Sequence, residues 1–357
     1  MIRHHRLGIA ILPLASLAVA ATAPIASASG SASATNGRIT GTVTAADTGA
    51  PIGKFCAVAA IDGKVKATDC RPHNGSYHLE ALAPGVYDVG FTTFTGLPRA
   101  GNYAPSWYGG GADRSTATPV SVTAGTETSG IDAALQLGGT IAGKATDART
   151  GRPLGAKAES CFYAKAVKPI AVPVAYDKGL MSADCSNVFH HGRYALAGLP
   201  TGTYVVYYDN GHLNGPYFPQ WYRGARHKSQ AKRLHVTIGK TLGGINARMA
   251  RSGQIVGKVV DAKTGKPLNS SDFYVVAYNA RGRMVTPDYW VGGNGVYHLP
   301  QLTTGNYRVA FTGAPYGYQD VWFDGSKTFK SAADVHVTTG KNTRLPTVRL
   351  HRLHRAH

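Results

Sequence analysis

One pattern of thirteen residues, G-x-Y-x-L-x-x-L-x-x-G-x-Y, occurs three times in this 357-residue chain without an insertion. The copies span residues 75–87, 192–204 and 295–307. Side chains alternate across a strand, so the first Tyr and the first Leu, two residues apart, share one face. The second Leu ends that strand, and the following Gly favours a turn. Each copy therefore predicts a β-hairpin with one buried face, and together they predict a repeated small β-domain.

A second motif precedes each copy and extends the repeat. It reads G-x-I-x-G-x-(V/A), and its second Gly stands at positions 41, 143 and 257, giving periods of 102 and 114 residues. A Pro follows that Gly by ten residues in every repeat, at Pro51, Pro153 and Pro267. This spacing predicts an opening strand, a turn, and a second strand entered through Pro, where a missing N–H costs least.

The composition favours strands over helices. Thr, Val and Tyr are frequent, no stretch shows helical apolar periodicity, and Glu occurs only at 80, 127 and 159. About seven short strands per repeat are typical of a Greek-key sandwich, so we predict an all-β chain of three tandem β-sandwich domains. We expect a signal peptide at 1–28, a flexible linker at 29–36, β-sandwich repeats at 37–137, 138–250 and 251–350, and a basic tail at 351–357.

Taken together, the two motifs resemble the carboxypeptidase regulatory-like domain. That domain is a transthyretin-like, carbohydrate-binding-like sandwich, close in fold to collagen-adhesin B-type modules and starch-binding-like domains. The resemblance covers nearly all of the chain after the leader and implies three tandem copies. It implies little about function, because such modules are accessories in proteins of many activities.

The first residues have the form of a secretory signal peptide. Arg3 and Arg6 form a basic head, an apolar run follows from about residue 7 to residue 23, and 26–28 read Ala-Ser-Ala, a small-x-small cleavage pattern. No later stretch approaches the ~20 apolar residues of a membrane helix. We expect a secreted, extracellular protein without membrane insertion, and association with a cell wall is left open.

The chain is strongly basic, with a formal net charge of +19 that falls to +17 without Arg3 and Arg6. The basic residues are scattered through all three repeats and form no recognisable nucleic-acid-binding element. We therefore expect no nucleic acid partner, and a polysaccharide or anionic cell-wall polymer as the counter-charge. The alternative is that the charge serves solubility alone. The sequence indicates no oligomeric state.

The four cysteines suit an oxidising compartment. Cys56 and Cys70 fall within the first repeat, and Cys161 and Cys185 occupy the equivalent interval of the second. Pairing within each repeat, 56 with 70 and 161 with 185, is the simplest of the three possible connectivities. No C-x-x-C pair is present, so we predict disulfides rather than a metal site, and no cofactor.

Signatures of catalysis are missing from the sequence. There is no H-E-x-x-H of a zinc peptidase and no G-x-S-x-G of a nucleophile elbow. Glycoside hydrolysis needs two carboxylates facing one sugar bond, and the three Glu offer no evident pair. We expect no catalytic residues. The alternative, an α-amylase-type hydrolase or its accessory starch-binding module, rests on the starch-binding-like fold alone.

The best candidate for a binding site is an aromatic loop that follows the glycine motif in each repeat. Aromatic faces stack on the apolar faces of sugar rings, and Trp and Tyr add a polar edge for hydrogen bonds. We therefore predict a secreted, non-catalytic binding or adhesion protein that recognises carbohydrate or a cell-envelope polymer through these loops. Alternatively, the loops pack over one end of each sandwich and the chain is a structural spacer without a ligand. The candidate residues are Tyr103, Trp107, Tyr108, Tyr217, Trp221, Tyr222, Tyr318, Trp322 and Phe323.

Overall fold

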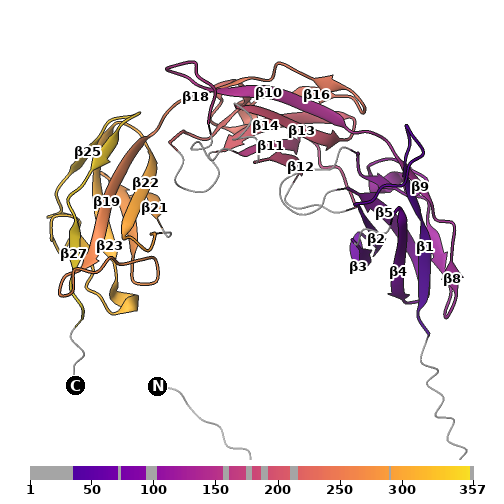
Figure 1. Ribbon diagram of the computed structural model, residues 1–357, viewed down its shortest axis with the longest axis horizontal. Helices are drawn as coiled ribbons and strands as arrows, with labels where there is room; N and C mark the ends of the chain where they lie inside the picture. The colour runs from indigo at the N-terminus through magenta and orange to yellow at the C-terminus, as the bar shows by residue number, and fades with distance from the viewer. Residues whose placement is uncertain are drawn as a thin grey trace, which may run out of the picture.

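The chain is all-β, as the sequence predicts, and its strands form six sheets in the computed structural model. Figure 1 shows three lobes that follow one another along the chain. The expected signal peptide lies outside the described residues, and in the described part no helix is long and apolar enough to cross a membrane. The structure describes residues 35–70, 74–93, 103–155, 161–173, 179–185, 192–209, 216–288 and 291–353.

Each lobe corresponds to one sequence repeat and contains nine described strands, more than the seven expected, because several are only two or three residues long. Repeat 1 has β1 Gly37–Ala45, β2 Cys56–Ile61, β3 Lys64–Asp69, β4 Ser76–Leu82, β5 Gly85–Thr92, β6 Ser106–Trp107, β7 Val120–Val122, β8 Glu127–Thr128 and β9 Ala133–Leu135. Repeat 2 has β10 Gly139–Asp147, β11 Cys161–Ala166, β12 Leu180–Asp184, β13 Arg193–Leu199, β14 Gly202–Asp209, β15 Gln220–Trp221, β16 Leu234–Val236, β17 Thr241–Leu242 and β18 Ala247–Met249.

The third repeat continues the same order, and short 3₁₀ turns interrupt some of the loops. Repeat 3 has β19 Gly253–Asp261, β20 Tyr274–Asn279, β21 Met284–Asp288, β22 Val296–Leu302, β23 Gly305–Thr312, β24 Val321–Trp322, β25 Val335–Val337, β26 Asn342–Arg344 and β27 Val348–Leu350. The 3₁₀ turns are η1 Arg114–Thr116, η4 Tyr222–Gly224, η5 Lys228–Gln230 and η6 Ala314–Tyr316.

Every repeat combines a four-stranded and a five-stranded sheet with the same connections. In repeat 1 the first sheet has the order β4-β1-β8, with β9 also pairing β1, and the second has the order β3-β2-β5-β6, with β7 also pairing β5. Strands β8 and β9 run parallel to β1, whereas β4 runs antiparallel to it. Repeats 2 and 3 reproduce both sheets strand for strand. The two sheets enclose a separate cluster of buried apolar residues in each repeat.

The glycine motif is not the β-hairpin that the sequence predicts. Its first strand, β4, pairs with β1, and its second, β5, pairs with β2, so the two strands belong to different sheets. Both bury their apolar faces, with Tyr77 and Phe91 meeting edge to face at 5.4 Å between ring centroids. The motif therefore crosses the core from one sheet to the other, which lets its two apolar faces meet from opposite sides.

A bulge explains why the two Leu of the motif, three residues apart, both point inward. Leu79 pairs with Ile39 and Leu82 with Gly37, so two residues of β4 oppose one of β1 between these pairs. Ala81 takes the left-handed conformation there, with φ of 57°, as do Gly198 and Gln301 at the same position. The spacing L-x-x-L is thus a signature of this bulge and not of a plain strand end.

The Pro of the opening motif does not begin a second strand. Pro51 makes a single bridge to Thr44 of β1, and Pro153 and Pro267 do the same to Thr146 and Val260. The chain turns back at a Gly of positive φ in each repeat, at 49, 151 and 265, and touches its own first strand before leaving it. The turn was predicted correctly, but the strand after it was not. Each Pro forms one isolated bridge instead of a strand, so the N–H that Pro lacks is not needed for a hydrogen bond there.

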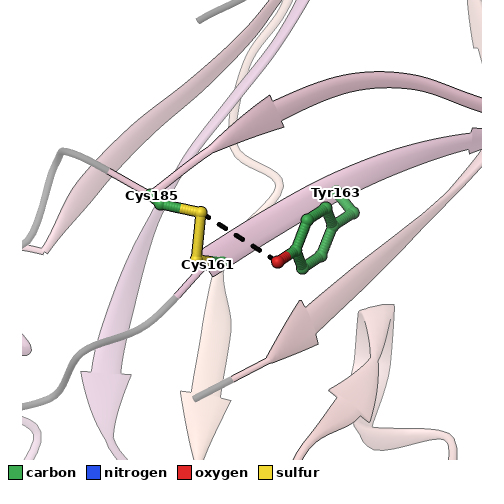
Figure 2. The surroundings of a disulfide bond; sticks show 3 residues. All are labelled: Cys161, Tyr163 and Cys185. Atoms are coloured by element: carbon green, nitrogen blue, oxygen red, sulfur yellow. Dashed lines mark hydrogen bonds between the residues drawn. A yellow bond between two sulfur atoms is a disulfide. The ribbon is translucent and has the colours of Figure 1, made fainter. Parts of the chain in front are cut away.

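Two disulfides are present, each within one repeat: Cys56–Cys70 and Cys161–Cys185. Each fastens the first residue of one strand, β2 or β11, to the residue that follows its hairpin partner. Figure 2 shows Tyr163 of β11 beside the second disulfide, with its hydroxyl 4.0 Å from Cys185 Sγ. A disulfide sulfur carries no hydrogen, so the hydroxyl donates, and the bridge helps to orient this partly exposed ring.

Candidate functional site

The first Tyr of each aromatic loop anchors the end of its own repeat. Tyr217 and Tyr318 form single bridges with Arg251 and Arg352, which follow the last strands β18 and β27. The Tyr217 hydroxyl donates to Asp147 Oδ2 at 3.0 Å, and Arg251 Nε donates to the same oxygen at 2.6 Å. Repeat 2 is thus closed at its end by a Tyr–Asp–Arg cluster around a buried carboxylate.

Repeat 3 contains the same cluster. Asp261 Oδ2 accepts from the Tyr318 hydroxyl at 3.0 Å and from Arg352 Nε at 2.9 Å. The guanidinium of Arg352 lies 5.1 Å from the Tyr318 ring centroid, and that of Arg251 lies 5.4 Å from the Tyr217 centroid. Such stacking adds a cation–π attraction to the ion pair.

Repeat 1 has an apolar counterpart of this cluster. Tyr103 bridges to Leu137 in place of an Arg, and the position of Asp147 and Asp261, the last residue of the opening strand, is Ala45. Ala45 is buried and Tyr103 packs partly buried against the core of repeat 1. The carboxylate and the guanidinium are therefore absent together from repeat 1, as they are present together in the other two.

The ion pair lowers the pKa of Asp147 well below its ordinary value. Burial alone would raise it, but the Arg251 guanidinium, the Thr150 backbone N–H and the Tyr217 hydroxyl all donate to the carboxylate and outweigh burial. The pKa of Asp261 is lowered as well, first by the backbone N–H of Thr264 and then by Arg352 and Tyr318.

These shifts predict a pH dependence of stability. A carboxylate with a folded pKa below the unfolded value of about 3.9 stabilises the fold above that value, and the contribution is lost as pH falls further. Repeat 2 should therefore unfold at lower denaturant concentration as pH drops below about 4. Hydrogen exchange resolved by repeat measures this loss. The double substitution Asp147→Ala with Arg251→Leu should make the stability of repeat 2 depend less on pH below about 4. If that pH dependence is unchanged by the double substitution, Asp147 is not its source.

Trp107 of repeat 1 is not available to a ligand, because repeat 2 covers it. The side chain is only 3% exposed, and its Nε1 donates to the carbonyl of Ala171 at 2.7 Å. Ala171 lies between β11 and β12 of repeat 2, far from Trp107 in sequence. Gly90 of β5 pairs with Trp107 of β6, and a Cβ added at Gly90 would meet Pro173 at 2.6 Å. Residues 170–173 of repeat 2, the docking segment, thus sit on the outer face of the five-stranded sheet of repeat 1.

The Ala171 peptide is held from both sides. Besides Trp107 Nε1, the Arg114 backbone N–H donates to its carbonyl at 3.1 Å. The Ala171 N–H donates to Asp113 Oδ2 at 3.1 Å. The pKa of Asp113 is lowered by the Ser115 N–H and hydroxyl together with the Ala171 N–H, so this acceptor is charged at neutral pH. Three hydrogen bonds to the backbone of Ala171 give the contact between the repeats a defined geometry, which apolar packing alone would not fix.

The docking segment exists because repeat 2 has a longer connection between its second and third strands. The connection between β11 and β12 covers residues 167–179, whereas β2 and β3 are joined only by Asp62 and Gly63. The same difference appears in the disulfide spacing, which is 24 residues in repeat 2 and 14 in repeat 1. Repeat 3 has a short turn at this place, between Asn279 and Met284.

A cavity of about 460 Å³ lies beside this contact and is lined by residues of both repeats. Three of the polar side chains on its wall already have partners. Ser106 Oγ donates to the Gly110 carbonyl at 3.1 Å, Thr116 Oγ1 donates to the Asp113 carbonyl at 2.7 Å, and Thr201 Oγ1 accepts from the Ile238 N–H at 2.9 Å. These three side chains therefore offer a ligand little polar recognition.

The equivalent tryptophans of repeats 2 and 3 are partly exposed. Trp221 lies against Tyr207, with ring centroids 4.8 Å apart, and Tyr207 lies 6.2 Å from Tyr163 in a stacked arrangement. Trp322 instead meets Tyr278 at 5.4 Å and Phe329 at 5.6 Å. Each of these groups lies on the outer face of a five-stranded sheet. Along the strands, these rings alternate with residues that point into the core, so they point away from it.

The nine predicted site residues thus lie in three kinds of surroundings. The three residues from each repeat stay on that repeat and are not brought together with those of the other repeats. Tyr217, Tyr222 and Tyr318 belong to buried cores, while Tyr103, Tyr108 and Phe323 pack partly buried against them. Trp107 lies in the contact between repeats 1 and 2. Trp221 and Trp322 alone among the nine lie partly exposed on an outer sheet face. Sequence reasoning assigned no role to Asp147, Asp261, Arg251 or the docking segment, and it placed Arg352, which binds Asp261 of repeat 3, in the basic tail.

Comparison with known proteins identifies no family. No family model matches the chain, and no curated protein matches it in sequence. Among solved structures it is similar to the Bacillus anthracis TIE protein, with 13% identity, a TM-score of 0.25, and coverage of 89% of this chain and 51% of that one. It is also similar to a streptococcal ancillary pilin (12% identity, TM-score 0.28, 90% and 100% covered). A third is the shaft pilin SpaA from Lactobacillus rhamnosus GG (12%, 0.29, 61% and 98%). At these scores the likenesses do not bear on what the chain does.

Proposed function

We propose that this chain is a non-catalytic extracellular spacer whose first two repeats are fixed to each other. The observation that carries the proposal is the burial of Trp107, since the aromatic loop of repeat 1 serves as a joint between domains. Two disulfides suit an oxidising, extracellular location. The resemblance to carboxypeptidase regulatory-like modules fits an accessory role and stays a prediction.

Short connections between repeats support a stiff arrangement. The last strand of repeat 1, β9, ends at Leu135, Leu137 pairs with Tyr103, and β10 begins at Gly139. A Cβ at Gly138 would meet the Gly198 backbone at 2.4 Å, so the chain passes close to repeat 2 as it enters it. Between repeats 2 and 3, the Ser252 N–H donates to the Pro216 carbonyl at 2.8 Å just before β19. Neither connection contains a flexible linker of several residues.

Small-angle scattering tests the spacer. Replacing residues 167–179 by the Asp-Gly turn of repeat 1 removes the docking segment but keeps both strands of the hairpin and the Cys161–Cys185 pair. We expect a larger radius of gyration and a broader distance distribution, because repeat 1 is released. Hydrogen exchange within repeat 2 serves as the control for folding. A scattering curve identical to that of the unaltered chain sinks the proposal.

Glycan binding is a second candidate function, favoured by the partly exposed Trp221 and Trp322. It cannot use three equivalent loops, since the Trp107 position is occupied by the docking segment. The hydrolase alternative gains no support from the described glutamates: Glu80 is exposed and Glu127 accepts from Thr40 and pairs with Arg38, while Glu159 lies outside the described residues.

A further inference from the structure

The outer face of the five-stranded sheet of repeat 2 differs from its counterparts by carrying a continuous aromatic row. Tyr163 of β11 pairs directly with Tyr207 of β14, and Tyr207 pairs directly with Trp221 of β15. Three adjacent strands therefore each contribute one ring at the same level, and all three rings keep part of their surface exposed. The same row reads Val58, Gly90, Trp107 in repeat 1 and Val276, Ala310, Trp322 in repeat 3.

The loop after Trp221 is strongly cationic. Each repeat has twelve residues between the Trp and the next strand, at 108–119, 222–233 and 323–334. The loop of repeat 2 contains five cations and no carboxylate, for a net charge of +5, whereas the other two loops are each neutral, with one and two opposite pairs. Its cations are Arg223, Arg226, Lys228, Lys232 and Arg233, all of them exposed.

No carboxylate near in sequence balances these charges. The chain has no Asp or Glu between residues 210 and 260. Among the ion pairs of the described residues, those within this stretch involve Arg251 alone, which is bound to Asp147. Arg223 lies over the Tyr222 ring at 5.9 Å from its centroid. The loop thus presents unneutralised positive charge to solvent.

This loop lies along the sheet edge where the aromatic row ends. It leaves β15, which pairs with Tyr207 and Tyr208 of β14, and enters β16, which pairs with residues 202–204 of the same strand. The seventh residue after the Trp lies on the outer face in the other repeats. Arg114 is 3.8 Å from Asp88 of β5, and Phe329 packs on Trp322. The matching residue in repeat 2 is Lys228, and η5 begins there as η1 begins at Arg114.

The outer face of the five-stranded sheet therefore has different surroundings in each of the three repeats. In repeat 1 the docking segment covers it, with Pro173 against Gly90 and Ala171 against Trp107. In repeat 3 its own Phe329 packs on Trp322, and Arg308 lies over the Phe329 ring at 4.5 Å. In repeat 2 the surface has rings and cations, together with Asp209 two residues beyond Tyr207 on β14, and among the described residues neither of these covers lies on it.

We propose that this face of repeat 2, formed by Tyr163, Tyr207, Trp221 and the 222–233 loop, binds an acidic polysaccharide. The rings stack on apolar sugar faces, and the loop cations pair with the carboxylates of the polymer. A polyanion without rings leaves the aromatic row uncovered, and a neutral polysaccharide leaves five cations unpaired. The disulfides place the protein where such polymers occur and nucleic acids seldom do. The site refines the glycan-binding candidate and does not depend on the spacer role.

Affinity electrophoresis of the full chain with sodium polygalacturonate at low ionic strength tests the site. We expect retardation that weakens with added salt, because the contacts with the carboxylates are screened. Dextran, which has sugar rings without charge, and polyphosphate, which has charge without rings, should each retard the chain much less. Trp221→Ala should weaken binding by about tenfold, the order found for loss of one aromatic stacking partner.

Matched variants make the result specific to repeat 2. Arg226→Gln with Lys228→Gln changes only exposed side chains and should weaken binding by about tenfold at low salt without unfolding the repeat. The controls in repeat 3, Trp322→Ala and the pair Lys327→Gln with Lys330→Gln, should leave retardation unchanged. Equal retardation by polyphosphate, equal loss from the repeat 3 controls, tighter binding of an oligothymidylate, or no retardation at all would each overturn the proposal. None of these outcomes depends on whether repeats 1 and 2 are fixed to each other.

Discussion

Asp147→Ala is expected to lower the free energy of unfolding of repeat 2 by about 3 kcal/mol. The carboxylate is buried and accepts from the Tyr217 hydroxyl, from Arg251 Nε and from the backbone N–H groups of Arg149 and Thr150. Its removal takes this acceptor from a buried hydroxyl and from a half-buried guanidinium, which costs more than the loss of the attraction itself. Denaturant unfolding followed by hydrogen exchange measures the change in repeat 2 separately from the other repeats.

Repeat 1 supplies the matched control, because it closes the same corner without charge. Asp147→Ala combined with Arg251→Leu reproduces its Ala45 and Leu137, and should recover all but about 1 kcal/mol. Asp47→Ala, at an exposed carboxylate in the turn of repeat 1, should change stability by less than about 0.5 kcal/mol. If the double substitution is as destabilising as Asp147→Ala alone, the cost does not come from orphaned partners and the account of the cluster is wrong.

Trp107→Ala should destabilise repeat 1 by about 3 kcal/mol, because the ring is buried between its own sheet and the docking segment. The matched substitution Trp322→Ala, at a partly exposed ring, should cost only about 1 kcal/mol. Thermal unfolding of the two variants, resolved by repeat, compares them directly. Equal losses would contradict the difference in burial.

A double-mutant cycle shows whether Trp107 acts through the docking segment. The chain with residues 167–179 replaced by Asp-Gly already lacks the Ala171 carbonyl that accepts from Trp107 Nε1. In that background Trp107→Ala should cost about 1–2 kcal/mol less than in the unaltered chain. Additive losses would mean that Trp107 stabilises repeat 1 alone.

The regular periodicity of the sequence was sufficient to predict the sandwich, and the predictions that were wrong have physical causes. The Tyr and Leu positions of the glycine motif are buried as predicted, because alternation fixes which face meets the core. Alternation says nothing about which strand pairs with which. The motif therefore looked like a hairpin, although β4 and β5 lie in different sheets. The bulge at Ala81, Gly198 and Gln301 was also hidden, since a non-Gly residue at positive φ leaves no fixed sequence mark.

The candidate sites were harder to predict, because they depend on differences between repeats rather than on what the repeats share. Asp147 and Asp261 stood in a repeated turn, and only Ala45 in the first copy marks them as members of a cluster with Arg251 and Arg352. The docking segment had a signal in the wider Cys161–Cys185 spacing, but the surface it would cover could not be read from spacing. Three equivalent Trp were predicted to act alike, and tertiary contacts gave them different surroundings.

Hydroxyl-radical footprinting of the tryptophans tests the central claim, that the aromatic loop of repeat 1 is a joint between domains, most directly. In the unaltered chain Trp107 should be oxidised far more slowly than Trp221, since the docking segment covers the first ring and leaves the second partly exposed. Replacing residues 167–179 by Asp-Gly should raise the rate at Trp107 and leave the rate at Trp322 unchanged. Oxidation of Trp107 as fast as that of Trp221 in the unaltered chain would contradict the account.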